Sequence, residues 1–175
     1  MNASAPPSRI VIVEPHKGAL VVMARRLSEV GYQVICCTNA SDAVAALHRA
    51  PVALLLAELR MVPMSGIELT RLVRDDGALS DLPVILINGR SDRNGACDAL
   101  AAGADHIVTK PFDFDVLMAK IVRAIARSGA MRELRQDNAT LDARVVRRAI
   151  ELGDVKAALR ASEVECRRLA AMVAH

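Results

Sequence analysis

Five short apolar runs, each followed by a stretch with helical periodicity, constrain the fold of this chain more than any other feature. Short apolar runs bounded by turn residues are typical of strands that are buried on both faces of a parallel sheet. The runs occupy Ile10–Val13, Gln33–Cys37, Val52–Ala57, Pro83–Ile87 and His106–Thr109. Strands that alternate with helices predict βαβ units with right-handed crossovers. We therefore predict an α/β fold, a doubly wound five-stranded parallel sheet covered on both faces.

The stretches between the runs carry apolar residues at spacings of three and four, which predicts helices. Gly31 and Gly103 are stop signals that end the first and the fourth of them. The predicted helices are Ala19–Val30, Ser41–Ala50, Ile67–Arg74, Ser91–Ala102 and Phe114–Arg127. All ten elements fit one domain, which leaves the last part of the chain as an appendage.

The composition narrows the class of protein. Aromatic residues make up 2% of the 175 residues, and the net charge is +3. These values argue against a nucleic-acid surface that works by base stacking. No apolar run approaches the roughly 20 residues of a membrane span, so we expect a cytoplasmic protein. The four cysteines show no C-x-x-C spacing, and we expect them to be reduced.

Polar residues follow several of the predicted strands. The carboxyl ends of parallel strands meet at one edge of the sheet, where doubly wound folds place their binding sites. This edge would gather Glu14, Glu58, Asn88 and Lys110. Two carboxylates facing one lysine are a weak signal alone, whereas their order along five strands is far more specific.

Four motifs around this edge, VIVEPHK, LLLAELRMVPMSGIEL, LPVILING and AAGADHIVTKPF, resemble those of the receiver domain of bacterial two-component response regulators. The resemblance covers about residues 9–127 and implies a flavodoxin-like sheet with strand order 2-1-3-4-5. In such receivers an aspartate after the third strand accepts a phosphoryl group from a histidine kinase. An acidic pair after the first strand helps to hold the required Mg²⁺.

This sequence fills the implied roles only in part. Glu58 stands at the position of the phospho-accepting aspartate, Glu14 at the first position of the acidic pair, and Pro15 replaces the second acid. Mg²⁺ requires near-octahedral oxygen ligation, to which Pro15 adds no side-chain oxygen. The extra methylene of Glu58 displaces its carboxylate by about 1.5 Å, and an error of about 1 Å can cost on the order of 100-fold in rate. We therefore expect no cofactor, with weak or absent Mg²⁺ binding.

Three further positions of the resemblance lie within or directly after the last two strands. Asn88 replaces the hydroxyl residue that contacts the phosphoryl oxygens, and Lys110 is the retained phosphoryl-contacting lysine. Ile107 stands where a switching aromatic is common. Together these departures predict a pseudo-receiver that takes no part in phosphotransfer and is not an enzyme.

The substitution at Glu58 has two interpretations. In the first, the pocket is a relic and the domain serves only for folding and docking. In the second, the extended carboxylate pairs with Lys110 and imitates the charge of the phosphorylated state. Residual phosphorylation is a third possibility, which a stable adduct on Glu58 would reveal.

After the receiver-like part, residues 128–175 carry an apolar heptad seam over about six heptads, which exceeds the three to four that indicate a coiled coil. The seam consists of Met131, Leu134, Asn138, Leu141, Val145, Leu152, Val155, Leu159, Cys166, Leu169 and Val173, with Arg148 and Ser162 as weak positions. Asn138 at an a position favours a two-stranded state. We predict a disordered lead-in (1–8), a receiver-like domain (9–127) and a helix (128–175) that forms a parallel homodimer.

Several alternatives remain open from the sequence. The helix could fold back on the receiver, and Ser128 with Gly129 could interrupt it or be absorbed into it. The chain could be the input fragment of a hybrid histidine kinase that ends at a phospho-accepting His175. The arginines of the helix could bind a cyclic dinucleotide. We favour a signalling or scaffold protein that dimerises and binds a protein partner in a bacterial pathway, without membrane or nucleic acid.

Overall fold

The computed structural model of the chain describes residues 8–89 and 93–173. The elements are β1 (Arg9–Val13), α1 (Lys17–Glu29), β2 (Gln33–Cys37), α2 (Ala40–Arg49), β3 (Leu54–Glu58), α3 (Gly66–Asp75), β4 (Val84–Asn88), α4 (Arg93–Ala101), β5 (His106–Thr109) and α5 (Phe114–Val173). All ten elements occur where the sequence predicts them, although α5 continues far beyond Arg127. The expected cap Ser91 and most of the expected lead-in (1–8) lie outside the described residues.

The strands form one sheet in the order β2-β1-β3-β4-β5, and every neighbouring pair is parallel. The register places Val13 beside Cys37 on one side and beside Ala57 on the other. The strands therefore end together at one edge of the sheet. This topology confirms the predicted doubly wound fold with strand order 2-1-3-4-5.

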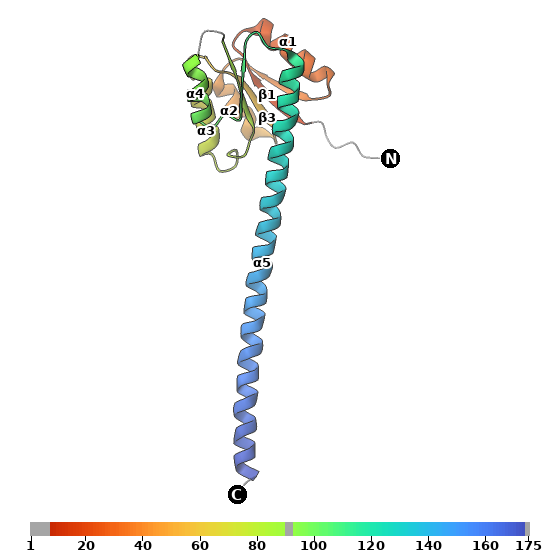
Figure 1. Ribbon diagram of the computed structural model, residues 1–175, viewed down its shortest axis with the longest axis vertical. Helices are drawn as coiled ribbons and strands as arrows, with labels where there is room; N and C mark the ends of the chain where they lie inside the picture. The colour runs from red at the N-terminus through yellow and green to blue at the C-terminus, as the bar shows by residue number, and fades with distance from the viewer. Residues whose placement is uncertain (1–7, 90–92, 174–175) are drawn as a thin grey trace, which may run out of the picture. The chain divides into compact units, whose positions relative to one another are not determined.

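The side chains of the sheet divide between two apolar clusters, because successive residues of a strand point to opposite faces. Ile10, Ile12 and Leu56 pack with α1 and with the first turns of α5. Val11 and Leu55 pack with α2, α3 and α4 on the other face. Figure 1 shows these helices on the two sides of the sheet. Both faces are covered, which explains why the strands read as continuous apolar runs.

Arg74, in the last turn of α3, joins elements at the amino edge of the sheet. Its guanidinium donates to the carbonyl oxygens of Gly103 (2.9 Å), Ser80 (3.0 Å) and Leu82 (2.8 Å). It also pairs with Asp105 at 2.9 Å, and the same carboxylate oxygen accepts from the backbone N–H of Val84. One side chain thereby fixes the loops that enter β4 and β5.

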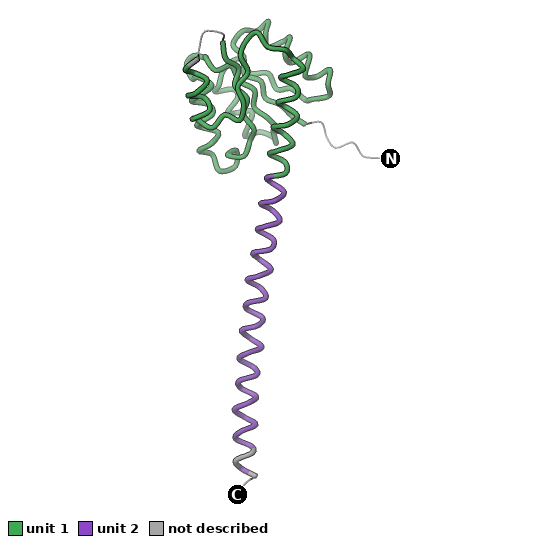
Figure 2. Tube along the Cα trace, viewed as in Figure 1, with its two compact units in different colours: residues 1–130 green, residues 131–175 purple. Residues whose placement is uncertain are grey.

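Helix α5 runs without interruption through Ser128 and Gly129. The chain divides into two compact units, residues 1–130 and residues 131–175 (Figure 2). Ser128 lies in the first unit, where its hydroxyl donates to the carbonyl oxygen of Asp81 at 2.9 Å. The sequence alone does not decide whether this helix is continuous, and the structure shows that Ser128 and Gly129 are part of it.

Gly66, the first residue of α3, provides a test of how tightly this helix packs against β3. A Cβ at Gly66 would lie 2.5 Å from the carbonyl oxygen of Glu58 and 3.0 Å from Cα of Leu59. We expect Gly66→Ala to lower the free energy of unfolding by about 1–3 kcal/mol, the usual cost of overpacking. Gly77→Ala is the matched control, because a Cβ there would meet nothing within 4 Å. Equal urea midpoints for the two variants would contradict this packing.

Candidate functional site

The carboxyl edge of the sheet brings three charged residues together. Glu14 follows β1 directly, Glu58 is the last residue of β3, and Lys110 follows β5. In the sheet order, β4 separates β5 from β3, and β1 lies one strand further. Strands are spaced by about 4.8 Å, so the lysine reaches its partners only because all three side chains are long.

The ammonium group of Lys110 bridges the two carboxylates. Its Nζ lies 2.8 Å from Oε2 of Glu14 and 2.5 Å from Oε2 of Glu58. The side chains of the two glutamates are 5% and 13% exposed, against 38% for the lysine. Hydrogen bonds between ionised groups are the stronger kind. The three residues therefore form one partly buried ion cluster, hereafter the Lys110 cluster.

A backbone contact holds Glu14 in place from the other side. Its Oε1 accepts from the N–H of His16 at 2.9 Å. The Nδ1 atom of His16 accepts in turn from the N–H of Ala19, so this histidine is the N-cap of α1. Pro15, between Glu14 and His16, is exposed. This role of His16 is not predictable from the sequence, because histidine is not among the preferred N-cap residues.

The two carboxylates have opposite pKa shifts. Burial would raise the pKa of Glu14, but the hydrogen bonds from Lys110 and from the backbone of His16, with the lysine charge, lower it below its ordinary value of 4.5. For Glu58, burial and the charge of Glu14 outweigh the influence of Lys110, and its pKa is raised. Burial opposes the charge of Lys110, yet its two partners raise its pKa. Glu14 is thus the firmly ionised member of the pair.

The other two expected site residues lie beside this cluster. Asn88, the last residue of β4, is buried, and its backbone carbonyl oxygen accepts from the backbone N–H of Lys110 at 2.8 Å. Ile107 packs its side chain against the apolar cluster on the α2, α3 and α4 side. Its carbonyl oxygen accepts from Nζ of Lys120 at 3.1 Å. The structure thus places Asn88 at the edge with the charged residues, whereas Ile107 is partly buried against an apolar cluster.

The loop between β3 and α3 ends in a capping box. The hydroxyl oxygen of Ser65 accepts from the N–H of Glu68 at 3.2 Å, and the Glu68 carboxylate accepts from the N–H of Ser65 at 2.8 Å. The S-x-x-E spacing is the sequence signature of such a box. The box fixes where α3 begins, and with it the loop that follows Glu58.

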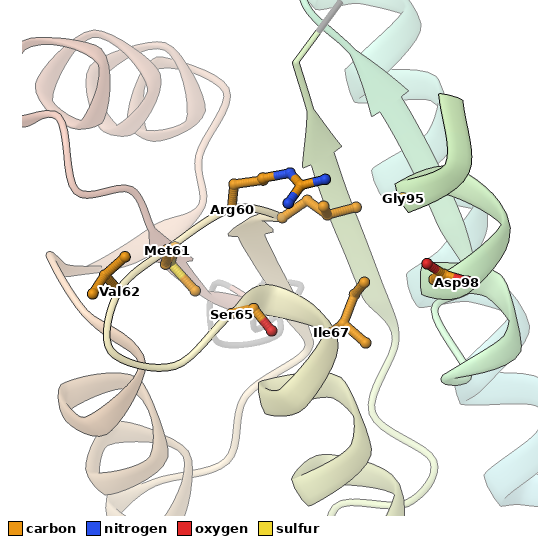
Figure 3. A pocket seen from close by; sticks show the side chains of 8 residues that line it. Arg60, Met61, Val62, Ser65, Ile67, Gly95 and Asp98 are labelled. Atoms are coloured by element: carbon orange, nitrogen blue, oxygen red, sulfur yellow. The ribbon is translucent and has the colours of Figure 1, made fainter. Parts of the chain in front are cut away.

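This loop also borders a pocket of about 370 Å³ (Figure 3). The pocket is lined by Leu59, Arg60, Met61, Val62, Ser65, Ile67, Gly95 and Asp98. Figure 3 shows the loop residues on one side and Gly95 and Asp98 of α4 on the other. None of the three residues of the Lys110 cluster is among the lining residues, so the charged site is not the floor of this pocket.

The seam residues of α5 are exposed in the single chain. The apolar seam residues whose side chains are described each expose between 43% and 67% of their surface: Met131, Leu134, Leu141, Val145, Leu152, Val155, Leu159 and Leu169. Asn138 and Cys166 are exposed as well. The side chain of Val173 lies outside the described part.

The family model of the response regulator receiver domain matches residues 10–122. The chain belongs to this family. The transcriptional regulatory protein KdpE of Mycobacterium tuberculosis is 33% identical over 127 residues, which is 73% of this chain and 55% of KdpE. The regulatory protein VanRB of Enterococcus faecalis is 31% identical over 76% of this chain and 60% of its own length.

A solved structure points to the same family. The signal receiver domain of a signal transduction histidine kinase from Syntrophus aciditrophicus has a TM-score of 0.64 and 30% identity, over 68% of this chain and 90% of that domain. The present receiver domain spans between 55% and 60% of the length of the two regulators. Among the residues described here, no helix combines the length and the apolarity that a membrane crossing requires. Membership of the family makes the chain a receiver domain of two-component signalling.

Replacing glutamate by glutamine at Glu14 and at Glu58 should change the free energy of unfolding with opposite pH dependence. Glu14→Gln removes a carboxylate whose pKa is lowered. Its cost, about 1–3 kcal/mol, should be complete at neutral pH and disappear as the pH falls through the folded pKa. Glu58→Gln removes a carboxylate whose pKa is raised, so this variant should gain stability over the wild type as the pH rises.

Urea unfolding of the three proteins between about pH 3 and about pH 7.5 measures both slopes. The wild type is the reference at every pH, because the charge of Lys110 is constant over this range. If the free energy of unfolding, taken relative to the wild type, changed with pH in the same direction for both variants, the opposite pKa shifts of Glu14 and Glu58 would be contradicted.

Proposed function

We propose that this protein is a pseudo-receiver, a receiver domain that signals without accepting a phosphoryl group and without enzymatic activity. The observation that carries the proposal is the Lys110 cluster. The lysine that contacts the phosphoryl group in the family is already engaged by Glu58, at the acceptor position, and by Glu14. A group that both carboxylates hold must break a charged hydrogen bond before it can receive another anion.

The residues present do not fit Mg²⁺. The acidic pair of the family is reduced to Glu14, because the exposed Pro15 adds no side-chain oxygen. One oxygen of Glu14 accepts from the backbone N–H of His16, and the other accepts from Lys110. A divalent ion would have to displace the ammonium group, and it would find few oxygen ligands there. We therefore infer weak Mg²⁺ binding or none.

Glu58 is also poorly placed for chemistry. Its longer side chain carries the carboxylate to Nζ of Lys110, at 2.5 Å, whereas a nucleophile has to point at an incoming phosphorus atom in line with the leaving group. The charge arrangement at the carboxyl edge then stays the same whether or not a phosphoryl donor is present. This favours a site that is fixed in one state.

We further propose that the chain dimerises through the seam of α5. Burial of a single Leu or Val side chain contributes about 1.5–3 kcal/mol, and the seam exposes many such side chains along one stripe. A partner helix with the same repeat would cover all of them at once. Asn138 at an a position favours two strands in register, so a parallel homodimer is the simplest partner arrangement.

A signalling partner has a candidate surface on the receiver as well. Leu100 of α4 and Val122 of α5 are both more than half exposed, and β5 lies at this edge of the sheet. Exposed apolar side chains on the helices that flank an edge strand are suited to a protein partner. We therefore propose a protein, and not a nucleic acid, as the partner.

The second candidate function is the receiver part of a histidine kinase. Its support is the likeness to the kinase receiver from Syntrophus aciditrophicus, at 30% identity. Residue His175, which would be the phospho-accepting histidine of this interpretation, lies outside the described residues. A gene that continues past His175 into an ATP-binding domain would favour this function over the scaffold.

Phosphotransfer is tested by mass spectrometry of the intact protein after incubation with acetyl phosphate and Mg²⁺. We expect no gain in mass, because Lys110 is engaged and the second acid is missing. The double variant Pro15→Asp/Glu58→Asp restores both acids and should gain the mass of one phosphoryl group. A wild-type adduct that maps to Glu58 would refute the pseudo-receiver.

The parallel dimer is tested by oxidative cross-linking through Cys166. In a parallel dimer in register, the two Cys166 residues face each other at an a position, whereas an antiparallel pair would separate them. The variant Cys36→Ser/Cys97→Ser removes the two exposed thiols of the receiver. We expect a covalent dimer in this background and none after Cys166→Ser. A monomeric mass by light scattering would contradict the dimer.

A further inference from the structure

Helix α5 carries a second apolar stripe that the seam does not use. In the register with Met131 at a, the b and f positions lie on the back of the helix, about 150° from the seam. A two-stranded coiled coil leaves these positions in water, where polar residues are usual. Between residues 139 and 164 they hold Ala139, Ala143, Val146, Ile150, Gly153, Ala157 and Val164, with Arg160 as an exception, whereas Arg132, Gln136 and Arg167 occupy the b and f positions on either side of this stretch. We call this set the back stripe.

The β-branched members of the back stripe are well exposed. Val146, Ile150 and Val164 expose 59%, 61% and 67% of their surface. The other members are small and also exposed. A dimer through the seam would leave this stripe uncovered, because its residues lie on the opposite side of each helix.

The spacing of the back stripe indicates what covers it. Its members alternate spacings of four and three from Ala139 to Ala157, which is the same 3.5-residue repeat as the seam. Residues with this repeat remain aligned along one face only when the helix takes part in a left-handed supercoil. The back stripe therefore fits a surface that has the same supercoil. A second dimer of this chain presents such a surface.

We propose that the back stripe pairs antiparallel with the back stripe of a second dimer, so that dimers associate side by side. In the antiparallel register that sets Ile150 opposite Gly153, the layers also set Val146 opposite Ala157 and Val164 opposite Ala139. Every β-branched residue then faces a small one, which lets the helices approach closely. A parallel register would instead set Ile150 against Ile150 and Gly153 against Gly153.

Charges on one flank agree with this register. Arg147 and Asp154 lie at c positions, and the antiparallel pairing brings each near the other residue of the facing helix. On the other flank, Asp142 and Glu163 would face each other and weaken the contact. We therefore expect reversible association that rises with concentration. Each dimer has two back stripes that face apart, so the assembly can grow beyond a tetramer.

This inference rests on the proposed dimer, and sedimentation of the full chain over a range of concentrations separates the two. Dimers that convert to tetramers and larger species support the inference. A dimer at every concentration overturns it and leaves the proposed function intact. A monomer overturns both.

Two sets of variants test the register. Gly153→Gln improves helix propensity but fills the space opposite Ile150, so it should stop association at the dimer. Ala158→Gln, at a position beside the seam, is the matched control and should associate like the wild type. Arg147→Asp should weaken association, and Arg147→Asp/Asp154→Arg should restore it. Association that persists in Gly153→Gln, or a double variant no better than the single, would refute the register.

Discussion

One ammonium group compensates two buried carboxylates at the carboxyl edge of this sheet. Burial disfavours the charge of both carboxylates, and the charge of Glu14 further opposes the ionisation of Glu58. Lys110, which reaches them from beyond β5, makes their coexistence possible. Loss of Lys110 leaves two buried carboxylates without their counter-charge, which costs far more than the intact cluster contributes. Both glutamates therefore depend on Lys110 whether or not the site performs chemistry. This dependence gives a reason for a phosphoryl-contacting lysine to remain in the proposed pseudo-receiver.

Much of this fold is readable from the sequence, for physical reasons that differ between elements. The bounds of β2 and β5 agree with the predicted runs, because Gly31 and Gly103 precede them at φ values of 96° and 99° and end the helices before them. The predicted third strand begins two residues early. Val52 is apolar because it packs against the core, whereas the pairing of β3 with β1 begins at Leu54. Apolar character thus marks burial, and hydrogen bonding decides where a strand begins.

The candidate site is readable only where it follows from chain order. Parallel strands must place Glu14, Glu58 and Lys110 at one edge, and the sequence predicts this placement.

Contacts elsewhere in the fold are not readable from the sequence. The contacts of Arg74 reach residues between 6 and 31 positions away, so no local pattern reveals them. Similarly, Gly129 costs a helix only about 1 kcal/mol, which is too little to decide from the sequence whether α5 continues.

If the charge arrangement of this receiver is fixed, as we propose, information has to be transmitted in another way. A ligand shifts an equilibrium only as far as its affinities for the two states differ. With Lys110 already held by Glu58, a phosphoryl donor has little differential contact to offer. In the proposed function, association is the variable quantity, because another chain or a partner can cover the exposed apolar surface of α5. The seam and the back stripe divide that surface between two faces of one helix. Small residues on the back stripe would bury less apolar area than the leucines of the seam, so we expect seam contacts to form first and back contacts to respond to concentration.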